Sequence, residues 1–175
     1  MRTRPYNDRA MKFPRCIRLD PSDLNIFHRA AEPGEWAVAG GFTFAEADPG
    51  AFDNKDKLAF QSGWLGTESF GRASLVEVAE IDEAGFARVV ERLARHFVEG
   101  YGAPELAAAL PAARQEADDA AGLCDHKLYS LLALEREMTE AGVVERFRVI
   151  VPERTADHAR IWEIVPEADD AQDAD

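Results

Sequence analysis

Apolar side chains recur at three- and four-residue intervals in residues 86–97, and this is the clearest periodicity in the chain. The stripe consists of Phe86, Val89, Val90, Leu93 and Phe97. Charged residues such as Arg88 and Glu91 fall on the opposite side, as is typical of an amphipathic helix. Asp82 is a suitable N-cap residue. The pattern therefore predicts a long helix from Asp82 to about Gly100.

A period of two predicts the strands. Large and small side chains alternate over residues 36–45, which indicates one bulky and one nearly bare face. Residues 75–81 are apolar and β-branched, and residues 147–151 alternate apolar with charged positions. Shorter strands are predicted at 16–19 and, at an edge, at 160–165.

Other helices are predicted from apolar spacing and from proline and glycine positions. Residues 52–64 form a short helix in this interpretation, and Pro104 opens another. Pro111 interrupts the alanine-rich run that follows, which favours two short helices over one rod. A further helix is predicted after Asp125, with Leu128, Leu131, Leu132 and Met138 on its apolar face and Gly142 at its end.

The order of these elements indicates the fold class. Strands that are adjacent in sequence without regular helix alternation favour an α+β fold, with a mostly antiparallel sheet of about four to five strands and helices packed on one face. A chain of 175 residues has the length of a single domain. Residues 1–11 are interpreted as a flexible N-terminal extension, 12–165 as a single α+β domain and 166–175 as a disordered acidic tail.

The charge narrows the range of partners. With 33 acidic and 20 basic residues, the formal net charge is −13 at pH 7. Such a body repels phosphate groups, which disfavours binding to nucleic acid or to an anionic membrane. The sequence contains neither an export signal nor a stretch of about 20 apolar residues. A cytoplasmic protein is therefore expected.

Residues of catalytic or metal-binding type are scattered. Cys16 and Cys124 are expected to be free, buried thiols rather than a disulfide. The only close trio of metal-ligand types is Cys124, Asp125 and His126, and it lacks the fourth ligand of a structural zinc site. Phosphate-loop, dinucleotide, nucleophile-elbow and zinc-protease motifs are absent. We therefore predict no catalytic residue, metal or cofactor, and the chain leans away from an enzyme.

Glycines, hydroxyls and an arginine gather in residues 63–72, and two interpretations stay open. Free amides, two hydroxyls and Arg72 could hold an anionic group while an aromatic ring stacks on a flat ligand. A tight connection that buries Trp64 and Phe70 explains the same residues. The candidate ligand-binding residues are Gly63, Trp64, Gly66, Thr67, Ser69, Phe70 and Arg72.

Three passages carry a family resemblance: KFPRCIRLD at 12–20, EPGEWAV at 32–38 and residues 65–72. On these passages, residues 12–152 resemble a small uncharacterised alphaproteobacterial family labelled as a domain of unknown function. The resemblance implies a bacterial cytoplasmic source, and an association with redox metalloenzymes and cofactor ligases. It supplies no catalytic residue.

Three functional hypotheses follow. The first is a non-enzymatic accessory or interaction protein that assists assembly of a larger redox enzyme. The alternative is a small anionic-ligand binder or enzyme that uses the Gly63–Arg72 loop. The third is a subunit whose exposed apolar face is covered by a second copy, which predicts a homodimer.

Overall fold

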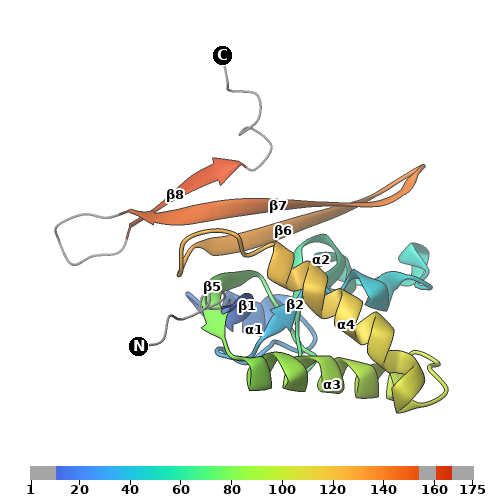
Figure 1. The fold of residues 1–175 in the computed structure, drawn as a ribbon. Helices are drawn as coiled ribbons and strands as arrows, with labels where there is room; N and C mark the ends of the chain where they lie inside the picture. Colours follow the sequence, from blue (N-terminus) through green and yellow to red (C-terminus); the bar gives the residue numbers. More distant parts are fainter. Residues whose placement is uncertain (1–10, 154–160, 167–175) are drawn as a thin grey trace, which may run out of the picture.

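Two antiparallel sheets form the framework of the computed structural model, which describes residues 11–153 and 161–166 (Figure 1). The larger sheet has five strands in the order β1-β5-β6-β7-β8: β1 (Met11–Ile17), β5 (Leu75–Ile81), β6 (Leu131–Thr139), β7 (Gly142–Glu153) and β8 (Ile161–Pro166). The smaller sheet joins β2 (Ala37–Val38), β3 (Trp64–Gly66) and β4 (Arg72–Ala73). The predicted α+β class is confirmed.

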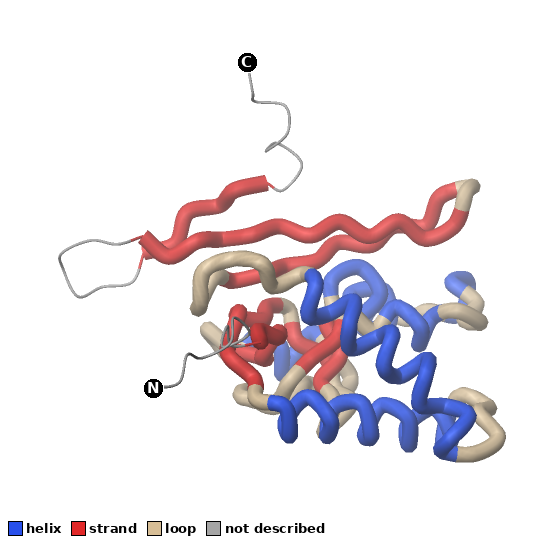
Figure 2. Tube along the Cα trace, in the orientation of Figure 1, coloured by secondary structure: helices blue, strands red, loops and turns tan. Residues whose placement is uncertain are grey.

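The helices lie below the β6–β7 hairpin in Figure 2, and one of them packs directly against β6. They are α1 (Ser22–Ile26), α2 (Asn54–Ser62), α3 (Glu83–Gly100) and α4 (Leu106–Gly122), with 3-10 turns η2 (Gly41–Phe44) and η3 (Pro49–Ala51). The helix predicted after Asp82 is confirmed: the Asp82 side chain accepts the N–H of Gly85 at 2.7 Å. None of the helices among these residues has the length and apolar character needed to cross a membrane.

The core consists of two buried clusters. In one, the ring of Phe13 on β1 packs edge to face on Phe86 of α3, with centroids 5.8 Å apart. In the other, Trp64 lies with Val76 and Leu132. A stripe of small residues brings α4 close to the first cluster; it consists of Ala109, Ala113, Ala117 and Ala120.

The strand predicted over residues 36–45 is wrong beyond Val38. Gly40 has a φ of +78°, in the left-handed region, and a side chain there would place a Cβ 2.5 Å from the Cβ of Leu65. Glycine avoids both penalties. The chain turns at Gly40 and continues as η2, so Phe42 and Phe44 share no pleated face with Trp36.

The break predicted at Pro111 is also wrong, because α4 is one continuous helix. Pro111 lies on the exposed side, while Ala109 and Ala113 beside it are buried. Packing on the buried side holds both halves in line, and one lost hydrogen bond is tolerated on the side that faces water.

The helix predicted after Asp125 is wrong as well: the segment forms β6 and the start of β7. Leu132, Leu134 and Arg136 point inward and pair with Val149, Phe147 and Glu145. Glu135 and Glu137 point to solvent. The alternation is real, but its third inward residue is a buried arginine.

The remaining predictions differ from the structure mainly at their ends. The first strand begins at Met11 rather than at residue 16, and the helix predicted at 52–64 is α2, which ends before Trp64. The strand at 75–81 is confirmed, and the edge strand predicted at 160–165 is β8. Most of the predicted extension and tail lies outside the described residues.

Candidate functional site

The Gly63–Arg72 segment forms a hairpin of β3, a turn and β4. Trp64 is fully buried, with its indole 5.8 Å from the ring of Phe147. The hydroxyl of Thr67 donates to the backbone oxygen of Trp36 at 2.9 Å. Trp64 and Thr67 thus tie the hairpin to the core and to the loop before β2.

A carboxylate of the chain itself occupies the turn of this hairpin. Glu35, which is 4% exposed, accepts the N–H groups of Glu68 and Ser69, each at 2.8 Å. It also accepts the Ser69 hydroxyl at 2.6 Å. Gly66 makes room, because a Cβ there would lie 2.4 Å from a Glu35 oxygen. An anionic ligand at these amides would therefore have to displace Glu35.

Phe70 and Gly71 complete the turn. Phe70 has a φ of +57°, and its ring stacks on His96 of α3 with centroids 3.7 Å apart. Burial lowers the pKa of His96, which favours the neutral imidazole in this stack. A Cβ on Gly71 would meet the backbone of Ala30 at 2.6 Å, so glycine is required by the close approach of two chain segments.

Arg72 extends from the hairpin to η2. Its guanidinium donates to the backbone oxygen of Gly63 at 3.1 Å and to the hydroxyl of Thr43, and it lies 4.8 Å from the centroid of Phe44. Burial, with a contribution from the nearby Arg136, lowers the pKa of Arg72 to about 9. Arg72 thus connects the hairpin to η2.

Arg136 is a second arginine beside Phe44, and no sequence pattern singled it out. It is 3% exposed and projects from β6. Its guanidinium pairs with Glu145 at 2.8 Å, donates to the backbone oxygen of Phe60 at 2.8 Å, and donates to that of Ala39. Arg136 thus joins α2, β6 and the residue before Gly40. The period of two through Leu132 and Leu134, continued to residue 136, is the sequence signal that predicts an inward position there.

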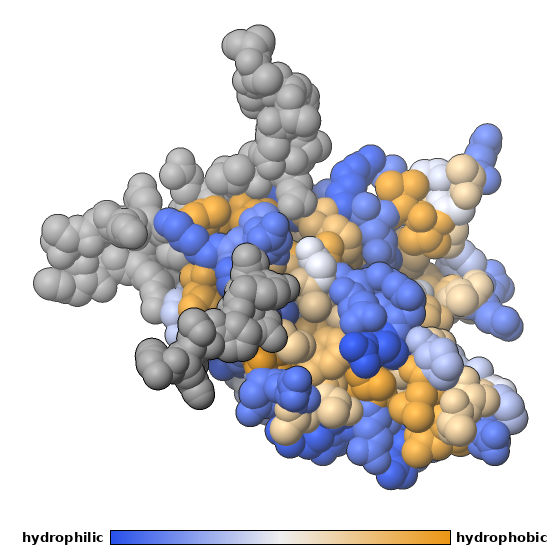
Figure 3. Space-filling model, in the orientation of Figure 1, coloured by the Kyte–Doolittle hydropathy of each residue, from blue (hydrophilic) through white to orange (hydrophobic). Residues whose placement is uncertain are grey.

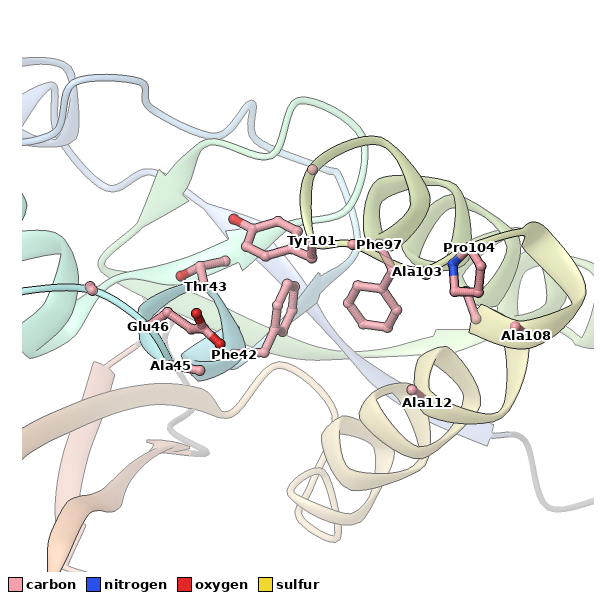
Figure 4. Close-up of a pocket in the computed structure, with 14 residues that line it drawn as sticks. Phe42, Thr43, Ala45, Glu46, Phe97, Tyr101, Ala103, Pro104, Ala108 and Ala112 are labelled. Carbon is pink, nitrogen blue, oxygen red and sulfur yellow. The ribbon is translucent and has the colours of Figure 1, made fainter.

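An apolar groove of about 800 Å³ lies between η2 and the turn that joins α3 to α4 (Figure 4). Phe42 packs edge to face on Phe97 and Tyr101, with centroids 4.9 and 5.4 Å apart. Small residues of α4, among them Ala108 and Ala112, form the facing wall. The groove therefore combines aromatic rings with a wall that a partner backbone can approach closely.

A smaller acidic cleft of about 350 Å³ lies on the other side of Phe42. Its walls carry three carboxylates, from Glu116, Asp119 and Glu145. The N–H of Gly40 reaches an oxygen of Glu116 at 3.4 Å. Burial is the main reason that the pKa of Glu116 is raised. Phe42 lines both cavities, so η2 separates the apolar groove from the acidic cleft.

One group in the described residues brings three possible metal ligands together: His28, Asp53 and Asp56. The His28 Nε2 is 2.9 Å from an Asp53 oxygen and 3.5 Å from an Asp56 oxygen. The two carboxylates also form the capping box of α2, each accepting the other's backbone N–H. Helix capping accounts for this exposed group without a metal.

Both cysteines are free and buried, as predicted. Burial raises the pKa of Cys124 to about 12 and raises that of Cys16 as well. Because the thiolate is the reactive form, both side chains act as small core residues.

Residues 11–163 match the model of a family described as Family of unknown function (DUF6505). The chain belongs to this family. No curated protein and no solved structure matches the chain. The match begins at the first residue of β1 and ends within β8, so it covers the hairpin, η2, the groove and the cleft. The resemblance to an uncharacterised family is confirmed.

Proposed function

We propose that this DUF6505 chain is a non-enzymatic interaction protein that holds an apolar segment of a protein partner in the apolar groove. In this role it acts as an accessory protein during assembly of a larger enzyme. The redox character of that enzyme is implied by the family resemblance alone.

The observation that carries the proposal is the composition of α4. Every residue from Leu106 to Ala113 is apolar, although part of this half-helix faces solvent. The exposed positions are Ala107, Ala108, Leu110, Pro111 and Ala112. Ala108 and Ala112 among them line the groove, which makes that side of the half-helix the one for a partner to cover. Tan and orange atoms gather over the turn between α3 and α4 (Figure 3).

The groove beside this surface suits a helical segment. The small side chains of Ala108 and Ala112 permit a partner helix to approach closely, and the rings of Phe42, Phe97 and Tyr101 can surround its large apolar side chains.

Charge favours a foreign partner over a second copy. Glu46 lines the groove, and Glu99 and Glu105 flank its lining residues at the α3–α4 turn. All three are exposed. A second copy would bring the same acidic rim against itself, whereas a segment with basic flanks would be attracted. The partner we propose is therefore an amphipathic helix with basic residues beside its apolar face.

Selection of helical peptides from a displayed library tests the proposal. Binders should shift the NMR signals of Phe42, Tyr101 and Ala112. We expect Ala112→Trp, which fills the groove, to weaken their binding at least tenfold. Ala107→Trp is the matched control, because Ala107 is exposed on the same helix and lies outside the groove lining; it should change affinity less than twofold. Equal affinity for both variants would contradict the proposal.

The oligomeric state in solution distinguishes a foreign partner from a second copy of the chain. Analytical ultracentrifugation at high protein concentration is expected to give a monomer. A dimer that Ala112→Trp dissociates and Ala107→Trp preserves would assign the groove to a second copy and overturn the partner proposed here.

Binding of a small anion by the Gly63–Arg72 loop is the second candidate. One observation favours it: the turn amides and the Ser69 hydroxyl do hold a carboxylate, that of Glu35. Anion binding there requires Glu35 to leave the turn.

A further inference from the structure

We propose that the partner helix carries a lysine or arginine about two turns from its apolar anchor, and that this basic side chain enters the acidic cleft. The proposal rests on the proposed function and adds the charge and the spacing of the segment that is recognised.

One face of α4 runs along both cavities. Ala108 and Ala112 line the groove, and Glu116 and Asp119 line the cleft. These positions follow one another at steps of four, four and three residues, so they share one side of the helix. At a rise of about 1.5 Å per residue, the cleft lies roughly 10–12 Å along α4 from the groove.

The cleft carries more negative charge than the positive groups beside it neutralise. Glu145 pairs with Arg136 at 2.8 Å. Glu116 and Asp119 instead accept hydrogen bonds from neutral donors, the Gly40 N–H at 3.4 Å and the Gln115 amide at 2.9 Å. Burial opposes ionisation of Glu116, the nearby Asp119 and Glu145 add to this effect, and the Gly40 N–H and Arg136 offset part of it. A further cation in the cleft would favour the ionised form of Glu116.

The distance along α4 sets the spacing in the partner. A partner helix that lies beside α4 has the same rise, so a separation of roughly 10–12 Å corresponds to seven or eight residues. Seven residues are close to two turns, which returns to the same face. The recognised pattern is thus a large apolar residue with a lysine or arginine seven or eight positions away, before or after it according to the direction of the partner helix.

Pairs of synthetic peptides test the spacing. Each is a terminally blocked 18-residue helix with leucines at an anchor position and four residues on, and a single lysine. The lysine stands seven residues from the anchor in one isomer and five residues from it, on the opposite face, in the other. Each pair is made twice, once with the lysine before the anchor and once with the lysine after it. We expect one seven-residue isomer to bind about tenfold more tightly than its five-residue control, and 0.5 M NaCl to reduce the difference.

Variants of the cleft locate the effect. Glu116→Gln with Asp119→Asn should remove the preference while the affinity of the five-residue isomer is unchanged. Asp118→Asn is the matched control, because Asp118 is exposed on α4 and pairs with Arg114 at 3.3 Å outside the cleft; it should retain the preference. Asp119→Lys should favour a peptide with glutamate at the seven-residue position.

The outcomes distinguish this inference from the proposed function. If both isomers bind equally and Ala112→Trp abolishes binding, the groove stands as the docking site and the basic anchor is wrong. If no peptide binds with sensitivity to Ala112→Trp, the proposed function itself fails. A preference that survives Glu116→Gln with Asp119→Asn also overturns the assignment to the cleft.

Discussion

Arg72 and Arg136 lie over the same phenyl ring, that of Phe44, with their guanidinium carbons 4.8 and 5.4 Å from its centroid. Cations are attracted to the face of an aromatic ring, so the Phe44 ring holds two positive charges at the end of η2. Glu145 balances the charge of Arg136. The pair therefore fixes the turn that carries Phe42 between the groove and the cleft.

Replacing Arg136 should destabilise the fold. Arg136→Met removes the pair with Glu145 and leaves the backbone oxygen of Phe60 without its donor. We expect a loss of about 3 kcal/mol in the free energy of unfolding, measured with urea. Arg148→Met is the control, since Arg148 pairs with Glu135 at the surface and should cost less than about 1 kcal/mol. Similar losses for the two variants would contradict a structural role for Arg136.

Arg136 also explains why the sequence indicated a helix where a strand exists. Buried positions of β6 alternate as Leu132, Leu134 and Arg136. Arginine is normally exposed, so a sequence pattern assigns Arg136 to solvent and the alternation ends at Leu134. Leu128, Leu131 and Leu132 have the three- and four-residue spacing of a helix. The position of Glu145, which makes the burial of Arg136 tolerable, becomes evident only when β6 and β7 pair.

Elements with a continuous local signal were predictable. The stripe from Phe86 to Phe97 and the cap at Asp82 identify α3 without tertiary information. At Gly40 the local signal misleads, because the alternation of large and small residues continues through a glycine that turns the chain. The requirement for glycine comes from Leu65, which lies against that position from another segment.

Removing Glu35 should destabilise the hairpin and create a site for small carboxylates. Glu35→Ala leaves the partly buried N–H groups of Glu68 and Ser69 without their acceptor. We expect a loss of about 3 kcal/mol, because each unsatisfied buried donor costs about 1–3 kcal/mol. Formate at high concentration should recover part of the loss in thermal unfolding.

Exposed Glu32 provides the control for this experiment. Glu32→Ala and the wild type should gain no stability from formate beyond a general salt effect, which sodium chloride at equal ionic strength measures. If formate stabilises the wild type to the same extent as Glu35→Ala, the turn binds anions with Glu35 present, and the second candidate function gains support.

The composition of residues 63–72 correctly suggested amides available to an anion, but it could not reveal the acceptor. Glu35 is more than 30 residues before Ser69 in the sequence, and only the antiparallel pairing of β2 with β3 brings them together. A loop rich in glycine and hydroxyls is thus equally typical of a ligand site and of a turn closed by an internal carboxylate.

Gly71→Ala should destabilise the protein by about 2 kcal/mol, since its Cβ would lie 2.6 Å from the backbone of Ala30 and backbone cannot yield as a side chain does. Gly122→Ala is the matched glycine, with open space around the added Cβ and a position at the end of α4. It should be neutral or slightly stabilising. Chemical unfolding of both variants measures the difference, and equal effects would refute the close approach of β4 to Ala30.

Glu116→Gln should raise the stability of the protein at pH 8, and the gain should shrink as the pH falls. Burial raises the pKa of Glu116, so the folded state binds its proton more tightly than the unfolded state does. Ionisation of Glu116 therefore costs stability as the pH rises through the folded pKa, and below the ordinary value near 4.5 the carboxyl is protonated in both states. Glutamine keeps an oxygen for the Gly40 N–H and carries no charge.

Urea midpoints at pH 8, 6 and 4 measure this effect, with Glu91→Gln as the control. Glu91 is exposed and pairs with Arg95 on α3, so its replacement should cause little pH-dependent change. A constant difference between Glu116→Gln and the wild type at all three values would contradict the burial of an ionised carboxylate. If the gain at pH 8 accompanies weaker binding of the lysine peptide, then the same carboxylate that lowers stability serves recognition, as is common at binding sites.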